Sequence, residues 1–284
     1  MESDRQMSAA WIMVPLFQIL SIVILVITII AIVFSGILSG VGPTTSGSVF
    51  ALAAIVGLLV IFLFVSFVLS IFFAVMLYRL VSRRNNHFAR QLFIYEDLEG
   101  TAKELAAKKG IDVSLSLDNL RRLKREAQSD EISRDAALWS VILVFAAGFS
   151  IPSLAFNGFA GVSLIAVFAQ YYVYYFLMKD WFRHERREDI FVYELARLFA
   201  AVGINLNLPR RSLPTPDRSF VVYLVLTIVT LGFFGVYWVY VLLTDPNNHL
   251  QYQAMVEDTI MAQMSPVLSG TQSPPPPPAP PPPM

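Results

Sequence analysis

Long apolar runs alternate with polar, charge-rich segments along the whole chain. The apolar runs are nearly free of charge and occupy residues 11–34, 50–78, 137–154, 162–178 and 220–243. A run of about 18 or more apolar residues is long enough to cross a bilayer as a helix. The pattern therefore predicts an all-α integral membrane protein with five transmembrane helices, or six if the last apolar segment is a hairpin.

The polar segments between these runs carry apolar residues at helical spacing, which predicts amphipathic helices on the cytoplasmic face. Asn85 and Asn86 are suitable N-caps for the first of them, and Asp118 for the second. Gly110 and Gly203 follow the ends of two such segments, where a C′ glycine is the expected stop signal. The predicted cytoplasmic helices span residues 85–109, 118–127, 181–202 and 249–264.

The three histidines of the chain recur at one spacing. Each lies nine residues after a tyrosine, in the pairs Tyr78/His87, Tyr175/His184 and Tyr240/His249, and a leucine follows each tyrosine by two residues. A spacing used three times predicts an internal repeat of a span followed by an interfacial helix. Residues 1–136 form unit one, 137–218 unit two and 219–264 an abbreviated unit three, followed by a proline-rich tail, 265–284, that we expect to be disordered.

The distribution of charge predicts the orientation. Segments 35–49 and 151–161 hold no charged residue, whereas segments 83–136 and 179–219 hold nearly all Lys and Arg. The positive-inside rule places the latter two, and the N-terminus, in the cytoplasm, as expected for a multi-pass protein of the cell membrane. For residues 220–243 a single span with the tail outside is favoured, because two hairpin arms of about 16 Å would cross only half of a core of about 30 Å.

Composition excludes several classes of chemistry. The 284 residues are 56% hydrophobic and 15% charged, and they include no cysteine. Disulfides, thiolate metal sites and cysteine nucleophiles are therefore excluded. The formal net charge is zero, which gives no electrostatic reason for a nucleic-acid partner. The expected partners are the lipid bilayer and a membrane or cytoplasmic protein.

One stretch of the last apolar segment resembles a known motif. The stretch reads Thr-Leu-Gly-Phe-Phe-Gly-Val-Tyr-Trp-Val-Tyr, and its motif positions are Thr230, Gly232, Gly235, Tyr237, Trp238 and Tyr240. It resembles the core motif of a prokaryotic membrane family that is filed as a domain of unknown function. The resemblance implies an integral membrane protein, and it implies no activity.

Candidate chemistry is sparse. His87, His184 and His249 would form a three-histidine zinc site if they converged. Such a site would require all three histidines on one side of the membrane. A single span at 220–243 would place His249 on the side opposite to His87 and His184. The favoured interpretation is that each histidine begins an interfacial helix, so no catalytic residue, metal or cofactor is predicted. The apolar cores also lack charged residues, which argues against an ion-coupled transporter.

These observations favour a non-enzymatic scaffold or accessory subunit that organises partners at the cytoplasmic membrane face. A channel or transporter for a small solute is the alternative, since internal repeats are common in such proteins. A metal-dependent membrane enzyme built on the histidines is the third hypothesis.

Overall fold

The computed structural model describes residues 6–38, 46–155 and 160–268, and every regular element in these ranges is a helix. A short 3₁₀ helix, Ala9–Ile12, precedes α1. The α-helices are α1 Met13–Leu38, α2 Ser46–Lys109, α3 Ser114–Asp130, α4 Ala136–Ala155, α5 Ala160–Ala201, α6 Phe220–Val229 and α7 Phe233–Leu268.

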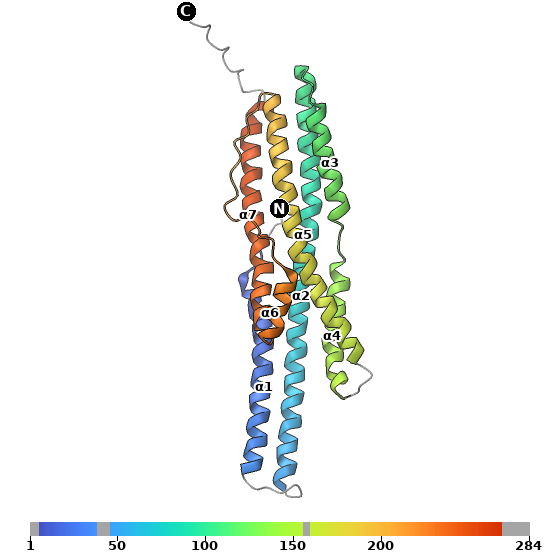
Figure 1. Ribbon diagram of the computed structural model, residues 1–284, viewed down its shortest axis with the longest axis vertical. Coiled ribbons are helices and arrows are strands. Elements are labelled where there is room, and N and C mark those ends of the chain that lie inside the picture. The colour runs from blue at the N-terminus through green and yellow to red at the C-terminus, as the bar shows by residue number, and fades with distance from the viewer. Residues whose placement is uncertain (1–5, 39–45, 156–159, 269–284) are drawn as a thin grey trace, which may run out of the picture.

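The helices form three antiparallel pairs, α1/α2, α4/α5 and α6/α7, and the second helix of each pair runs upward in Figure 1. α2, α5 and α7 are therefore parallel to one another. The part of each helix that precedes its tyrosine (Tyr78, Tyr175 or Tyr240), which points downward in Figure 1, is about 48 Å long in α2, 22 Å in α5 and 10 Å in α7, at 1.5 Å per residue. We call the parts beyond these tyrosines (residues 79–109, 176–201 and 241–268) the distal bundle.

The separate cytoplasmic helices expected from the sequence are instead continuations of the helices that carry the apolar runs. α2, α5 and α7 pass through Asn85, Trp181 and His249 without a break. Asn85 is not an N-cap, because its side chain bonds the backbone of Arg134, donating to the carbonyl oxygen at 2.6 Å and accepting from the amide at 3.1 Å. Because α2, α5 and α7 are continuous at these positions, the predicted helix starts at residues 85, 181 and 249 are wrong.

The last apolar segment is a hairpin, and the favoured single span is wrong. α6 begins at an N-cap, Ser219, and ends at Thr230. Leu231 and Gly232 then adopt φ values of 51° and 94°, which a helix cannot continue through. α7 returns alongside α6 (Figure 1). His249 and the end of α7 consequently lie on the same side as the ends of α2 and α5.

The structure confirms the predicted helix-stop glycines but not the predicted N-cap of α3. Gly110 and Gly203 adopt φ values of 62° and 83°, so both predicted glycine stops are confirmed. The predicted cap at Asp118 is wrong: α3 starts at Ser114, whose amide donates to the Asp112 carboxylate at 2.9 Å. α3 also extends beyond the predicted 118–127. It packs against α2 and α5 through Leu117, Leu120, Leu123 and Ala127.

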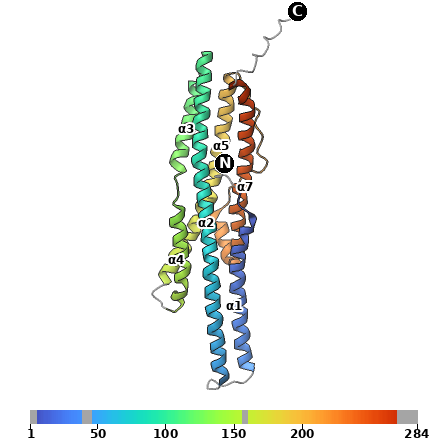
Figure 2. The same cartoon turned by 180° about the vertical axis from the view of Figure 1, so that it is seen from behind.

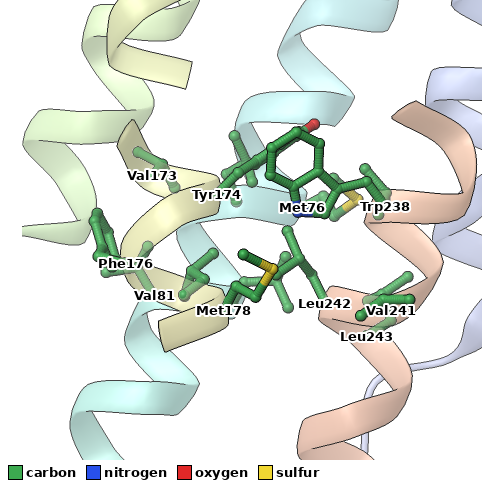
Figure 3. Close-up of a cluster of buried hydrophobic side chains, with 14 of the residues drawn as sticks. Met76, Val81, Val173, Tyr174, Phe176, Met178, Trp238, Val241, Leu242 and Leu243 are labelled. Atoms are coloured by element: carbon green, nitrogen blue, oxygen red, sulfur yellow. The ribbon is translucent and has the colours of Figure 1, made fainter. Parts of the chain in front are cut away.

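Two large buried apolar clusters, and a small one of Phe88, Trp181 and Leu250 beside the histidines, hold the described helices together. The first lies at the level of the tyrosines, where fully buried Trp238 packs against α5, and Figure 3 shows Tyr174, Met76 and Leu242 around it. The second fills the distal bundle between α2, α3, α5 and α7, with Phe199, Leu198 and Leu120 fully enclosed. The histidines lie between the two clusters.

Within the described residues, two helical stretches are long and apolar enough to cross a membrane, Ala9–Ser35 and Leu52–Lys109. Two shorter apolar stretches, Ala136–Phe145 and Phe220–Val229, fall in the predicted third and fifth spans. The helix at the C-terminus continues to Leu268, so the predicted tail begins later than residue 265. The proline-rich residues themselves lie outside the described ranges.

Candidate metal centre

Three parallel helices with one common spacing place three histidines at one level. Tyr78, Tyr175 and Tyr240 are 46, 37 and 41% exposed, so each tyrosine faces outward. The leucines two residues later (Leu80, Leu177 and Leu242) are buried, as are His87, His184 and His249. Seven residues separate each leucine from its histidine, which is two helical turns on the same inward face. The histidines therefore lie inside continuous helices with buried rings, and do not begin interfacial helices as expected.

The imidazole rings of His87, His184 and His249 form a nearly regular triangle. Their ring centroids are 5.1, 5.1 and 5.2 Å apart in the three pairs. One possible ligand atom from each ring lies within 4.8 Å of the other two. The Nε2 atoms of His87 and His249 are 3.1 Å apart. Three converging imidazole nitrogens are a ligand set that proteins use for zinc.

Carboxylates hold two of the rings by their outer nitrogens. Nδ1 of His184 is 2.9 Å from Oε1 of Glu131, in the linker between α3 and α4. Nδ1 of His249 is 3.3 Å from Oε2 of Glu185 on α5. A carboxylate accepts, so each Nδ1 carries the proton and donates. The neutral ring then presents its Nε2 lone pair towards the centre of the triangle.

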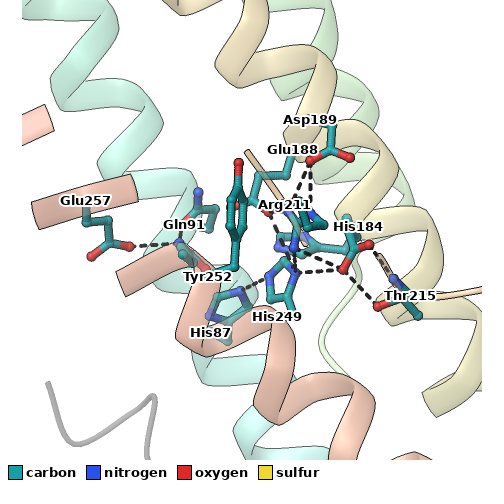
Figure 4. A network of polar contacts seen from close by, with 12 residues as sticks. His87, Gln91, His184, Glu188, Asp189, Arg211, Thr215, His249, Tyr252 and Glu257 are labelled. Atoms are coloured by element: carbon teal, nitrogen blue, oxygen red, sulfur yellow. Dashed lines mark hydrogen bonds and ion pairs between the residues drawn. The ribbon is translucent and has the colours of Figure 1, made fainter. Parts of the chain in front are cut away.

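The loop between α5 and α6 closes over this site and inserts Arg211 (Figure 4). The Arg211 guanidinium donates to Glu185 at 3.1 Å, to Glu188 at 2.7 Å and to Asp189 at 3.1 Å. It also lies 3.9 Å over the ring of Tyr252. Nη1 of Arg211 is 3.3 Å from Nδ1 of His249, but that donor already bonds Glu185, so Glu185 is the partner that fixes the His249 tautomer.

Thr215 fastens the same loop to the carboxylate that holds His249. Its amide donates to Oε1 of Glu185 at 2.6 Å, and its hydroxyl donates to Oε2 at 2.8 Å. Oε2 of Glu185 thus accepts from both the Thr215 hydroxyl and the His249 imidazole, while Oε1 accepts from the Thr215 amide. The position of this carboxylate, and hence of the His249 ring, depends on the loop between α5 and α6.

Burial dominates the protonation of the site. Burial lowers the pKa of His184 and His249 well below the usual histidine value, so both are neutral at pH 7. Burial raises the pKa of Glu131 to about 7, against the opposing charge of Arg187. Burial likewise raises the pKa of Glu188 to about 8, although Arg211 lowers it.

Glu185 behaves differently from the other buried carboxyls. Burial opposes its ionisation, but hydrogen bonds from His249 and Thr215 and the charge of Arg211 outweigh that penalty. The pKa of Glu185 is lowered as a result. The carboxyl that holds His249 is therefore ionised and accepts the hydrogen bond of Nδ1–H.

A second polar layer lies one turn beyond the histidines, and sequence reasoning missed it. Gln91, Glu188 and Gln253 each follow a histidine by four residues, and all three are buried. Gln253 donates to Gln91, and at 2.8 Å to Glu257. The threefold occurrence of a polar residue four positions after histidine was a visible signal for this layer.

Between the level of the tyrosines and that of the histidines, a buried ion pair joins α2 to α5. Nη2 of Arg84 lies 2.7 Å from Oδ2 of Asp180, and the Arg84 side chain is fully buried. Aromatic rings separate this pair from the imidazoles. Trp181 stacks on His87 at 5.2 Å, and Phe88 stacks on His184 at 4.2 Å.

The motif residues build the α6/α7 hairpin and do not reach the histidines. The Thr230 hydroxyl accepts from the Phe234 amide at 2.9 Å at the start of α7. Gly232 supplies the positive φ of the turn. Gly235 faces α6 so closely that a Cβ there would lie 3.4 Å from Thr227. Trp238 is buried in the first cluster, whereas Tyr237 and Tyr240 are exposed.

Comparison with known proteins agrees with the resemblance to a domain without assigned function. No curated protein and no solved structure matches the chain. The chain is similar over residues 218–271, which comprise α6 and α7, to the family described as Domain of unknown function (DUF4234).

Proposed function

We propose that the chain is a multi-pass membrane scaffold, with three helical hairpins inserted from the cytoplasmic face and the distal bundle presented to cytoplasmic partners. The observation that carries this proposal is the parallel direction of α2, α5 and α7, which puts the Lys- and Arg-rich segments at one end (Figures 1 and 2). The positive-inside rule makes that end cytoplasmic.

The N-terminal segment supports the same arrangement. The Met7 amide donates to Oδ1 of Asn247 at 3.0 Å, and Nδ2 of Asn247 donates back to the Met7 carbonyl at 2.8 Å. Met7 therefore lies beside α7, two residues before His249 in the register of that helix. A cytoplasmic N-terminus then requires a cytoplasmic distal bundle.

The three hairpins differ in depth below the tyrosines. The α1/α2 pair, with α2 extending for about 48 Å, is long enough to cross a bilayer core of about 30 Å. α5 reaches about 22 Å and α7 only about 10 Å at the same rise per residue. We infer one complete spanning hairpin and two that enter to decreasing depth. The common Tyr–Leu–His register supports an internal repeat, now with all three units facing the same way.

The surface and interior of the distal bundle favour a scaffold over an enzyme. His87, His184 and His249 are at most 2% exposed, so a substrate could not reach them in this conformation. The outer faces, in contrast, carry exposed apolar side chains, among them Phe93 on α2, Tyr193 on α5 and Met261 on α7. Such side chains provide contact area for a protein partner.

Cysteine labelling tests the topology without background, because the chain has no cysteine. We expect Val49→Cys to react with a membrane-impermeant maleimide in intact cells. Lys108→Cys and Leu268→Cys should react only after permeabilisation. Labelling of Leu268→Cys, but not of Lys108→Cys, in intact cells would contradict the hairpin arrangement.

Crosslinking followed by affinity capture from native membranes tests the scaffold role. We expect a stoichiometric protein partner whose recovery falls in Phe93→Ser and Tyr193→Ser. Lys103→Ser, a polar-site substitution on the same bundle, should leave recovery unchanged. A chain that runs alone as a monomer would contradict the proposal.

A further inference from the structure

We propose that His87, His184 and His249 bind one late first-row transition-metal ion, best Zn²⁺, which fastens α2, α5 and α7 together in the distal bundle. This goes beyond the scaffold role and does not depend on the identity of any partner. The ion would contact one helix from each hairpin. It would therefore add a third link between helices that ion pairs already join two by two, α2 to α5 through Arg84 and Asp180 and α2 to α7 through Arg90 and Glu257.

The distances suit such an ion. Zinc–imidazole bonds of about 2.0–2.1 Å in a tetrahedral shell place the ligand nitrogens about 3.3 Å apart. The Nε2 atoms of His87 and His249 are already 3.1 Å apart. The ligand atom of His184 lies within 4.8 Å of both, so a small rotation of that ring completes the set. A solvent ligand would occupy the fourth position.

The outer hydrogen bonds orient the rings as metal ligands. Metal-bound histidines almost always donate their second ring nitrogen to a carboxylate, carbonyl or water, which fixes the tautomer. Glu131 does this for His184, and Glu185 does it for His249. Arg187 donates to the same Oε1 of Glu131 that faces His184. Arg211 likewise donates to the same Oε2 of Glu185 that faces His249, so an arginine holds each carboxylate beside its imidazole.

A second observation points to a missing ligand at the centre of the triangle. Nε2 of His184 is buried and finds no hydrogen-bond partner within the described part of the chain. Buried polar atoms normally have a partner, because leaving one unpaired costs about 1–3 kcal/mol. Nδ1 of the same ring is already bonded, so a cation that accepts the Nε2 lone pair would satisfy it.

The donor chemistry selects the class of metal. Neutral imidazole suits Zn²⁺, Cu²⁺, Ni²⁺ and Fe²⁺, whereas Mg²⁺ and Ca²⁺ take oxygen ligands. No carboxylate oxygen points into the triangle from Glu131 or Glu185, since both bond the outer nitrogens. Three nitrogen ligands without a thiolate therefore favour a divalent ion of the zinc type.

Metal analysis of the full-length chain is the first test. The protein is purified in detergent through a tag without histidine, incubated with ZnCl₂, dialysed and analysed by mass spectrometry of the elements. We expect one Zn²⁺ per chain, and loss of that ion in His87→Ala, His184→Ala and His249→Ala. Gln91→Ala, one turn away, is the matched control and should keep the ion.

Cobalt spectroscopy supplies a readout that needs no variant to fold. Co²⁺ added to the wild-type protein should give the intense visible bands of a tetrahedral site, and Zn²⁺ should displace it. Weak bands of octahedral, solvated Co²⁺ would overturn the proposal. So would a zinc content well below one per chain, or zinc retained when all three histidines are replaced.

The orienting carboxylates are tested by affinity. Loss of such a carboxylate partner typically weakens metal binding about 10- to 100-fold. We expect that loss for Glu131→Gln and Glu185→Gln. Asp189→Asn removes a carboxylate from the same Arg211 network without touching a histidine, and should bind as wild type does. Wild-type affinity in both glutamine variants would overturn the assigned ring orientation.

Discussion

Nε2 of His87 on α2 and Nε2 of His249 on α7 lie 3.1 Å apart, although 162 positions separate them in the chain. The contact is possible only because α7 runs parallel to α2, and that direction is set by the hairpin turn at residues 230–232. The three histidines can therefore converge only in a chain whose last apolar segment folds back as a hairpin.

Removal of the proposed metal should lower thermal stability. An ion present at about 100 times its dissociation constant stabilises the folded state by about 2.7 kcal/mol. We expect EDTA to lower the unfolding temperature of zinc-loaded protein by several degrees in circular dichroism melts. His184→Ala should melt at the same temperature with and without EDTA, and an equal shift in that variant would contradict the prediction.

Substitution of Asp180 by Asn should destabilise the fold strongly. The change leaves the fully buried Arg84 without its counter-charge, which typically costs about 3–5 kcal/mol. Equilibrium unfolding in detergent micelles measures the loss. The control is Asp217→Asn, which breaks the more exposed pair with Lys179 and should cost no more than about 1 kcal/mol. Similar costs for the two variants would be inconsistent with a buried ion pair.

Gly232→Ala should destabilise the α6/α7 hairpin. Gly232 has φ +94°, where a Cβ is strained whatever the surrounding space, so we expect a loss of at least about 1 kcal/mol. Gly57→Ala is the matched control, because Gly57 lies inside α2 with open space around it. Helix propensity predicts a gain of up to about 1 kcal/mol there. Unfolding free energies of the two variants should differ in sign.

Arg211→Lys should release the loop between α5 and α6. A lysine keeps the charge but cannot bond Glu185, Glu188 and Asp189 together, nor stack as a planar group on Tyr252. We expect faster hydrogen exchange at the Thr215 amide and a loss of stability of about 1–3 kcal/mol.

The neighbouring substitution Arg210→Lys controls for the loss of an arginine in the same loop. Arg210 is exposed, so this variant should exchange and unfold as the wild type does. Unchanged protection of Thr215 in Arg211→Lys would show that the loop is held by other contacts.

The sequence alone determined the helical class, the glycine stops and the inward or outward direction of the repeated residues. Gly110 and Gly203 end their helices through their own backbone conformation, which is a local property. The spacing of Tyr78, Leu80 and His87 likewise fixes which of them share a helical face, because helix geometry sets about 100° per residue. Helix breaks at Asn85 and its counterparts were mispredicted, since an asparagine can bond a distant backbone as readily as it caps a helix.

Only the tertiary structure decided the direction of α7 and the surroundings of the histidines. A run of 24 apolar residues has the same pattern whether it spans once or folds back, and the outcome depends on how closely Gly235 lets α7 approach Thr227 on α6. Glu131, Glu185 and Arg211 come from a linker, a helix and a loop, 38 to 64 positions from the histidines that they contact. No periodic signal marks such partners, because packing between helices, and not position along any one of them, brings the side chains together.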